Sequence, residues 1–134
     1  MNLLDKIKKN EGFRSTVYQC SEGYDTIGYG FAIKDLEIER DIADIILERK
    51  KEKLTKRIIL ALEWYNNSPE IVQDVVFEMC YQMGLSGFLQ FKKTIYYLET
   101  EQYEEAAGEM LDSLWHKQAP SRSQELSDDI FSLA

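Results

Sequence analysis

The sequence of 134 residues has little of what metal centres and disulfide frameworks require. It contains two cysteines, Cys20 and Cys80, and a single histidine, His116, with no CxxC pattern. These are too few ligands for a structural zinc site. A disulfide between the two cysteines is left open but not favoured, because Cys80 lies in an apolar helical pattern, where a free thiol acts as a small hydrophobe.

Long apolar runs are also missing. The first residues, "MNLLDKIKKNEG", form a charged amphipathic segment that fits neither a signal peptide nor a membrane anchor. Proline and glycine number only two and seven, which argues against a disordered chain. We therefore expect one compact unit with a core of its own, small enough that two lobes would share it.

Basic side chains are scarce in the second half of the chain. Residues 1–69 hold 12 acidic and 12 basic residues, whereas residues 70–134 hold 12 acidic and 4 basic ones, which accounts for the net charge of −8. Such a half repels nucleic acid and anionic membranes at physiological salt, and it attracts other anionic polymers only weakly. Nucleic acid and anionic membranes are therefore poor partners, and neither nucleic-acid binding nor membrane insertion is expected. Most of these charges are expected to be solvated helix faces.

The order of apolar and β-prone segments predicts a small α+β part followed by helices. Apolar residues in 3–11 predict a short helix that ends near Gly12. The runs "STVYQC" and "YDTIGYGF", separated by "SEG", predict a β-hairpin. Residues from about 37 to 63 are helical in pattern, and the charge run "ERKKEK" is expected in the middle of a long connecting helix or at a break in it.

The segment "NNSP" predicts the start of a further helix. Ser68 suits the N-cap and Pro69 the first helical position. This helix is predicted to bury six residues: Ile71, Val72, Val75, Val76, Met79 and Cys80. Helical patterns then continue to about residue 131. Together these segments predict a mainly helical α+β fold with a small N-terminal lobe, a helical C-terminal lobe and a cleft between them.

A glutamate, a threonine and two glycines are the first candidates for chemistry. Glu11 falls at the predicted end of the first helix, where partial burial would raise the pKa of its carboxyl and keep it protonated as a general acid. In "TIGYGF", Gly28 and Gly30 alternate along a strand, where missing side chains let backbone and ligand approach closely. Thr26 adds a hydroxyl before them. Taken alone, a glutamate at a helix end is usually an exposed residue without a catalytic function. The two glycines fit a bulge or twist in a hairpin equally well.

These residues lie in a segment that resembles the active site of a known family. "NEGFRSTVYQCSEGYDTIGYGF", residues 10–31, is similar to the active-site segment of phage-type lysozymes, glycoside hydrolase family 24. The signature of that family is a glutamate, eight residues, an aspartate or cysteine, five residues and a threonine. Glu11, Cys20 and Thr26 meet this spacing. "YQMGLSGF" at 81–88 and "WHKQAPSR" at 115–122 resemble two further motifs of the family.

The resemblance covers nearly the whole chain and implies a single lysozyme-like domain, residues 1–134. Its N-terminal lobe would take in about residues 12–60, with the hairpin and the connecting helix. Its C-terminal lobe would take in about residues 61–134 together with the helix 1–11. The implied protein is a monomer.

The implied activity is that of a phage or prophage endolysin, a muramidase. It would hydrolyse the β-1,4 bond between N-acetylmuramic acid and N-acetylglucosamine in bacterial peptidoglycan. Glu11 would protonate the departing glycosidic oxygen, while Cys20 and Thr26 would position the attacking water. Arg14 and Arg122 would support the site, Arg122 by pairing with Glu11. The residues implied to lie near the bound sugar are Tyr29, Gly30, Tyr81 and Gln82, although both tyrosines equally suit core packing.

Cys20 stands where the family tolerates either an aspartate or a cysteine. In an inverting mechanism the second group positions or activates a water, and a thiolate could do so. A thiol with a pKa of about 8.5 is mostly neutral at pH 7 unless its surroundings favour the thiolate. If Cys20 stays neutral, Thr26 and Glu11 bear more of the work; in the plainest interpretation Cys20 only packs a strand end. Phe31 replaces a histidine of the family, which is expected to change packing more than chemistry.

Proton transfer and water attack need no metal and no organic cofactor. Three other interpretations stay open: a non-catalytic peptidoglycan-binding or virion structural module, a lytic transglycosylase that uses Glu11 alone, and a peptidase or amidase built on Cys20 and His116. In the leading hypothesis the protein is made in the host cytoplasm. It would reach the cell wall, in the periplasm, through a holin-dependent lesion of the membrane.

Overall fold

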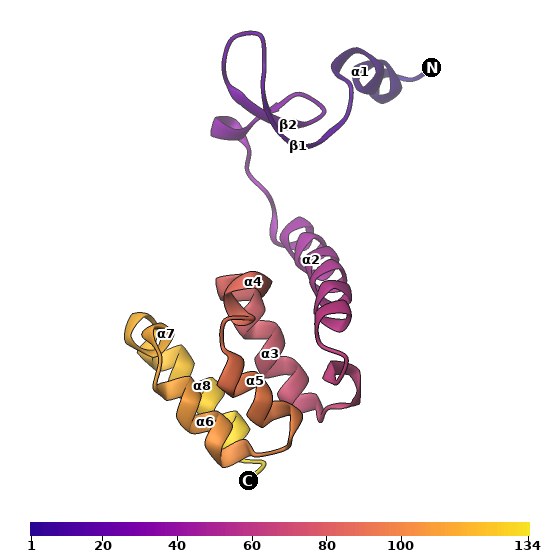
Figure 1. Cartoon of the computed structure of the whole chain (residues 1–134). Coiled ribbons are helices and arrows are strands. Elements are labelled where there is room, and N and C mark those ends of the chain that lie inside the picture. Colours follow the sequence, from indigo (N-terminus) through magenta and orange to yellow (C-terminus); the bar gives the residue numbers. More distant parts are fainter. The chain divides into compact units, whose positions relative to one another are not determined.

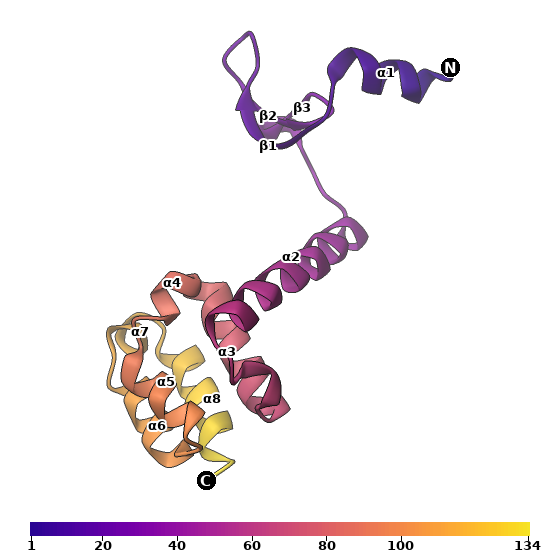
Figure 2. The same ribbon diagram turned by 45° about the vertical axis from the view of Figure 1, so that its right-hand side comes forward.

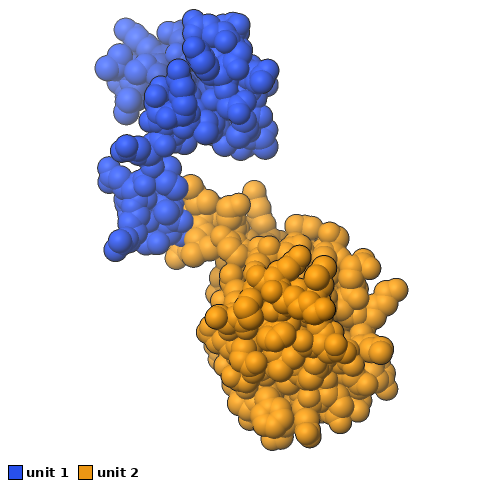
Figure 3. All heavy atoms as spheres, turned by 90° about the vertical axis from the view of Figure 1, so that its left-hand side faces the viewer, with its two compact units in different colours: residues 1–45 blue, residues 46–134 orange.

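The computed structural model describes residues 1–134, which divide into two compact units, residues 1–45 and residues 46–134 (Figure 3). Figures 1 and 2 show helices along most of the chain and a small sheet near its start. The predicted mainly helical α+β class is therefore confirmed. The elements are, in chain order, α1 (Leu3–Glu11), β1 (Arg14–Gln19), β2 (Asp25–Gly28), β3 (Phe31–Ala32), α2 (Arg40–Ala61), α3 (Glu70–Met83), α4 (Leu85–Phe88), α5 (Lys92–Glu99), α6 (Tyr103–Leu111), α7 (Leu114–Gln118) and α8 (Pro120–Phe131).

The first unit begins with the predicted helix. The side chain of Asn2 caps α1 by accepting a hydrogen bond of 2.8 Å from the backbone N–H of Asp5. The helix ends at Glu11, where Gly12 adopts a φ of 71° and donates its N–H to the carbonyl of Lys8. Glycine adopts this positive φ without strain, so Gly12 lets the chain leave the helix. The predicted end near Gly12 is confirmed.

An antiparallel sheet of three strands, in the order β1-β2-β3, follows α1. The predicted hairpin is β1 with β2, in which Tyr18 pairs with Thr26. The pattern of "YDTIGYGF" predicts one β-prone run and not the separate strand β3. Gly28 and Gly30 have φ angles of 71° and 75°, so the chain turns between them and Phe31 returns to pair with Ile27. The alternating glycines thus mark a turn.

Aromatic contacts, rather than an aliphatic core, hold the turn of this unit. Thr26 is its one buried residue. The ring of Tyr29 lies 5.5 Å from that of Phe13 and 6.3 Å from that of Phe31, between ring centres. A Cβ on Gly28 would approach the Phe31 ring to 2.7 Å, so the phenylalanine occupies the space that this glycine leaves free.

The helix α2 runs without a break from Arg40 to Ala61, so the charge run "ERKKEK" lies within one continuous helix, as the first of the two alternatives had it. All six residues of that run are exposed, and Ile58 is the one fully buried residue of α2. No helix of the protein combines the length and the apolar composition needed to cross a membrane.

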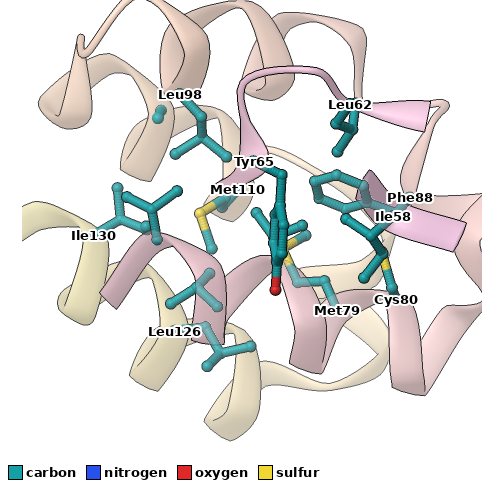
Figure 4. Close-up of a cluster of buried hydrophobic side chains, with 14 of the residues drawn as sticks. Ile58, Leu62, Tyr65, Met79, Cys80, Phe88, Leu98, Met110, Leu126 and Ile130 are labelled. Atoms are coloured by element: carbon teal, nitrogen blue, oxygen red, sulfur yellow. The ribbon is translucent and has the colours of Figure 1, made fainter. Parts of the chain in front are cut away.

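The second unit surrounds a hydrophobic core, part of which is shown in Figure 4. Helix α6 packs against α5 and α8, and α3 contacts α4 and α8. Five of the six residues that were predicted to be buried in α3 are buried, and Met79 and Cys80 lie in the cluster of Figure 4. Ile71 is the exception, because it lies in the first turn of the helix and is 40% exposed.

The predicted cap of α3 is wrong in detail. The helix starts at Glu70, its N-cap is Pro69, and no side chain caps it. The hydroxyl of Ser68 instead donates a hydrogen bond of 2.9 Å to the carbonyl of Trp64, in the turn that precedes the helix. Serine hydroxyls satisfy either a helix N–H or a nearby carbonyl, and here the carbonyl takes the contact.

Candidate active site

The first unit brings four of the predicted site residues onto neighbouring elements. Glu11 ends α1, Cys20 follows β1, Thr26 lies in β2, and Gly30 lies in the turn between β2 and β3. Two contacts result. Glu11 meets Gly30, and the thiol of Cys20 lies beside the loop 20–24 and Thr26.

The side chain of Glu11 lies directly against Gly30. A Cβ on Gly30 would come within 3.1 Å of the carboxyl carbon of Glu11 and within 3.5 Å of its Cγ, and closer still to Oε2. Any side chain at position 30 would therefore displace the carboxyl group. Near this contact, the ammonium of Lys8 lies 5.6 Å from the centre of the Tyr29 ring. Together with Phe13 on Tyr29, this contact ties the end of α1 to the β2–β3 turn.

A tight loop holds the thiol of Cys20. Its backbone N–H donates to the carbonyl of Tyr24 at 2.9 Å, and its carbonyl accepts from the N–H of Gly23 at 2.9 Å. The backbone N–H groups of Tyr24 and Glu22 point to the sulfur and lower the pKa of Cys20. Partial burial and the carboxylate of Glu22 act in the opposite direction but do not outweigh them. The pKa of Cys20 is therefore lowered relative to an ordinary thiol, the direction in which the catalytic interpretation of this residue needs it to move.

Thr26 is the neighbour of this thiol on the sheet. It is 3% exposed, and its hydroxyl donates to the carbonyl of Tyr24 at 2.9 Å. A hydrogen bond from the same hydroxyl to Cys20 also lowers the pKa of the thiol. One hydroxyl proton serves one acceptor at a time, so the thiolate competes with the Tyr24 carbonyl for it. We therefore regard the two backbone N–H groups as the main support of the thiolate.

Two other predicted residues of this unit contact neighbouring side chains. Arg14 pairs with Gly28 across the sheet, and its guanidinium lies 4.6 Å from the centre of the Tyr18 ring. Tyr29 packs between Phe13 and Phe31, which is the packing alternative considered for it. Their roles toward a substrate stay predictions.

The second unit holds the remaining predicted residues. Tyr81 is 47% exposed and stacks on Phe77, with ring centres 6.1 Å apart. Gln82 is oriented by Trp115, whose indole N–H donates to Oε1 of Gln82 at 3.0 Å. The sequence alone predicts no role for Trp115, although this residue is the first of the motif "WHKQAPSR". This contact joins the two C-terminal motifs.

Arg122 lies 3.6 Å from the carboxylate of Glu78 within the second unit. Both side chains are about half exposed, so this ion pair adds little to stability. The predicted pairing of Arg122 with Glu11 stays a prediction, as do the cleft and the packing of helix 1–11 on the helical lobe.

A hollow of about 530 Å³ in the second unit is lined in part by Trp115, the partner of Gln82. Apolar side chains such as Phe91 and Trp115 line it, together with the polar Thr94 and Gln118. Cations and carboxylates also line it, namely Lys92, Lys93, Glu109 and Asp112. Its mixed chemistry suits a ligand with both apolar and charged groups.

His116, Cys80 and the possibility of a metal site are the remaining candidates for chemistry. Nδ1 of His116 lies 2.6 Å from the hydroxyl of the buried Ser123. Both cysteines are free, and burial raises the pKa of Cys80 to about 12. No three His, Cys, Asp or Glu side chains are grouped in a way that could hold a metal ion.

Comparison with known proteins identifies the class to which this fold and this site belong. The profile of the family described as phage lysozyme matches residues 8–128. The chain therefore belongs to the phage lysozyme family, which supports a glycosidase-type enzyme with a lysozyme-like function.

The relatives of this chain include three named proteins. Two are proteins of Dictyostelium discoideum named probable T4-type lysozyme 1 and 2, which are 30% and 27% identical to this chain. Each alignment covers 91% of this chain and 89% of the relative. The third is the pre-baseplate central spike protein Gp5 of Enterobacteria phage T4, which is 23% identical over 95% of this chain but over only 27% of its own length.

The contrast between the two thiols gives a prediction. Iodoacetamide should alkylate Cys20 in the native protein with a pH midpoint below the ordinary thiol value of 9.0, because its pKa is lowered. Cys80 should react only after unfolding, because it is buried and its pKa is raised to about 12. Peptide mass spectrometry of a pH series measures both rates.

A variant pair tests the contribution of the threonine to the state of the thiol. Thr26→Val should move the Cys20 midpoint to higher pH, whereas Thr16→Val, the same change at an exposed position, should leave it in place. A native Cys20 that stays inert up to pH 9, or a Cys80 that reacts as fast, would contradict this account.

Proposed function

We propose that this protein is a muramidase of glycoside hydrolase family 24. Its reaction would be hydrolysis of the β-1,4 bond between N-acetylmuramic acid and N-acetylglucosamine in bacterial peptidoglycan. Membership of the phage lysozyme family supports peptidoglycan as the substrate. The single observation that carries the catalytic assignment is the contact of Glu11 with the bare Cα of Gly30, beside a sheet that also presents Cys20 and Thr26.

In this proposal Glu11 is the general acid. Its carboxyl proton passes to the glycosidic oxygen as the bond to the anomeric carbon breaks. A water held by Cys20 and Thr26 adds its oxygen to that carbon from the opposite face, with inversion. The proton that this water loses passes to the Cys20 thiolate. The thiolate charge also stabilises the positive charge that develops on the sugar, and its loop favours that charge before substrate binds.

The second unit would supply the substrate contacts outside the reacting bond. Tyr81 offers an exposed aromatic face, and Gln82 is held in one orientation by Trp115. The hollow beside Trp115 adds both cations and carboxylates, which suit the peptide part of peptidoglycan. Arg14 and Arg122 would act in support, the latter by pairing with Glu11.

The biological role in this proposal is that of a phage or prophage endolysin. The protein would be made as a monomer in the host cytoplasm and act on the wall after a holin-dependent lesion of the membrane. The T4-type lysozyme relatives, which the chain matches over most of their length, support a lysozyme role.

A virion structural module is the second candidate, because one relative is a spike protein. The chain matches Gp5 over 27% of that protein, so a segment similar to this chain occurs inside a larger structural protein. A module of this kind would bind purified sacculi without releasing new reducing ends, and that outcome would favour this candidate over the muramidase.

Glu11→Gln tests the acid directly. Removing the transferable proton should lower the release of reducing ends from sacculi by about 10²–10⁴-fold, the usual contribution of a general acid. The circular dichroism spectrum and melting temperature should stay close to those of the wild type, since Glu11 is exposed. Glu37→Gln, the same change at another exposed position of the first unit, serves as control and should keep full activity. Full activity of Glu11→Gln would refute the assignment.

Gly30→Ala tests whether the glycine leaves room for the carboxyl group of Glu11 or only for the sugar. A methyl group there would push the Glu11 carboxyl aside, so kcat should fall by about 10²-fold while KM changes little. A methyl group that only blocks the sugar would raise KM instead. Gly84→Ala is the matched control for backbone strain, because Gly84 has a φ of 84° and no atom within 4 Å of its missing Cβ. Equal losses of kcat in both variants would show that Gly30 does not position Glu11.

A further inference from the structure

The middle of α2 is strongly basic although the chain as a whole is acidic. Between residues 49 and 57 the sequence is "RKKEKLTKR", with six cations and a single carboxylate, that of Glu52. The net charge of the whole chain is −8. None of the residues assigned to the proposed active site lies in this segment.

Five of these cations share one face of the helix. Arg49, Lys53, Lys56 and Arg57 follow the spacing i, i+4, i+7 and i+8, and Lys50 borders the same face. All five are exposed, whereas Ile58, on another face, is fully buried in the core of the second unit. This basic stripe is about 12 Å long, at a rise of about 1.5 Å per residue.

The stripe is not neutralised by the protein itself. The one ion pair of the structure joins Arg122 and Glu78, and no carboxylate lies within 4.0 Å of a stripe cation. Like charges at i and i+4 destabilise a helix. Glu52 is the one carboxylate at helical spacing from stripe cations, three residues after Arg49 and four before Lys56. The like-charge pairs Arg49–Lys53 and Lys53–Arg57 outnumber what this single carboxylate can offset, which points to a partner outside the chain.

We propose that the basic stripe binds the carboxylates of peptidoglycan and so holds the protein on its polymeric substrate. This inference rests on the proposed function only for the identity of the polymer. A row of exposed ammonium and guanidinium groups matches a polymer that carries carboxylates at intervals along its length. At physiological salt the screening length is about 8 Å, so acidic surfaces farther away are screened while contacts at the stripe persist. The local charge, and not the net charge, then decides binding.

Binding to insoluble sacculi tests this inference without the need for turnover. The probe is the full chain carrying Glu11→Gln, so that the polymer stays intact during the assay. Lys50→Gln, Lys53→Gln and Lys56→Gln together should weaken binding by roughly tenfold, as expected for three exposed ionic contacts. The control combines Lys6→Gln, Lys9→Gln and Lys117→Gln, which removes the same charge outside the stripe and should change binding by less than about twofold.

A second arm identifies the ligand group. Sacculi whose carboxyl groups have been amidated with carbodiimide and ammonia should bind the parent and the stripe variant equally weakly. The proposal is overturned if the stripe variant binds like the control, if the difference persists on amidated sacculi, or if it requires phosphodiester polymers attached to the wall. Release of reducing ends by the chain with Glu11 intact is measured separately on short soluble fragments. Its absence would refute the muramidase assignment and leave the binding result standing.

Discussion

The close approach of the Glu11 carboxyl to the Cα of Gly30 is the contact around which the first unit is arranged. It requires a residue without a side chain at position 30, and the left-handed backbone there favours glycine for a second reason. Gly28 likewise leaves free the space that the ring of Phe31 occupies. The two glycines together let a short turn return as β3 while it carries the acid on one side and an aromatic ring on the other.

Around this turn, aromatic contacts replace the core that the first unit lacks. Phe13, which follows α1, packs on Tyr29, and Tyr29 meets Phe31 edge-on. Phe31 occupies the position at which the resemblance to phage-type lysozymes leads us to expect a histidine. In this protein its ring fills space over Gly28 and contacts Tyr29, so the replacement acts on packing near the acid. The expectation that this change concerns packing is consistent with these contacts.

Much of the fold could be predicted from local signals in the sequence. Gly12 marked the end of α1, and the apolar spacing of α3 identified five of its buried residues. The errors have local causes as well: a strand of two residues gives too short a pattern to detect, and the Ser68 hydroxyl prefers the Trp64 carbonyl to the helix terminus. The site residues were named by a motif. Their contacts, such as Gln82 with Trp115, join segments 33 positions apart and could not be predicted from spacing.

The charge state of Cys20 decides whether this residue can accept the proton of the attacking water in the proposed reaction. Two backbone N–H groups lower its pKa. In the proposed reaction its thiolate positions a water beside Thr26. The most direct test is mass spectrometry of muropeptides released from purified peptidoglycan in ¹⁸O-labelled water. The account predicts new reducing N-acetylmuramic acid ends that carry one ¹⁸O atom. Products with 1,6-anhydro ends, lighter by one water and without label, or the absence of any products, would contradict it.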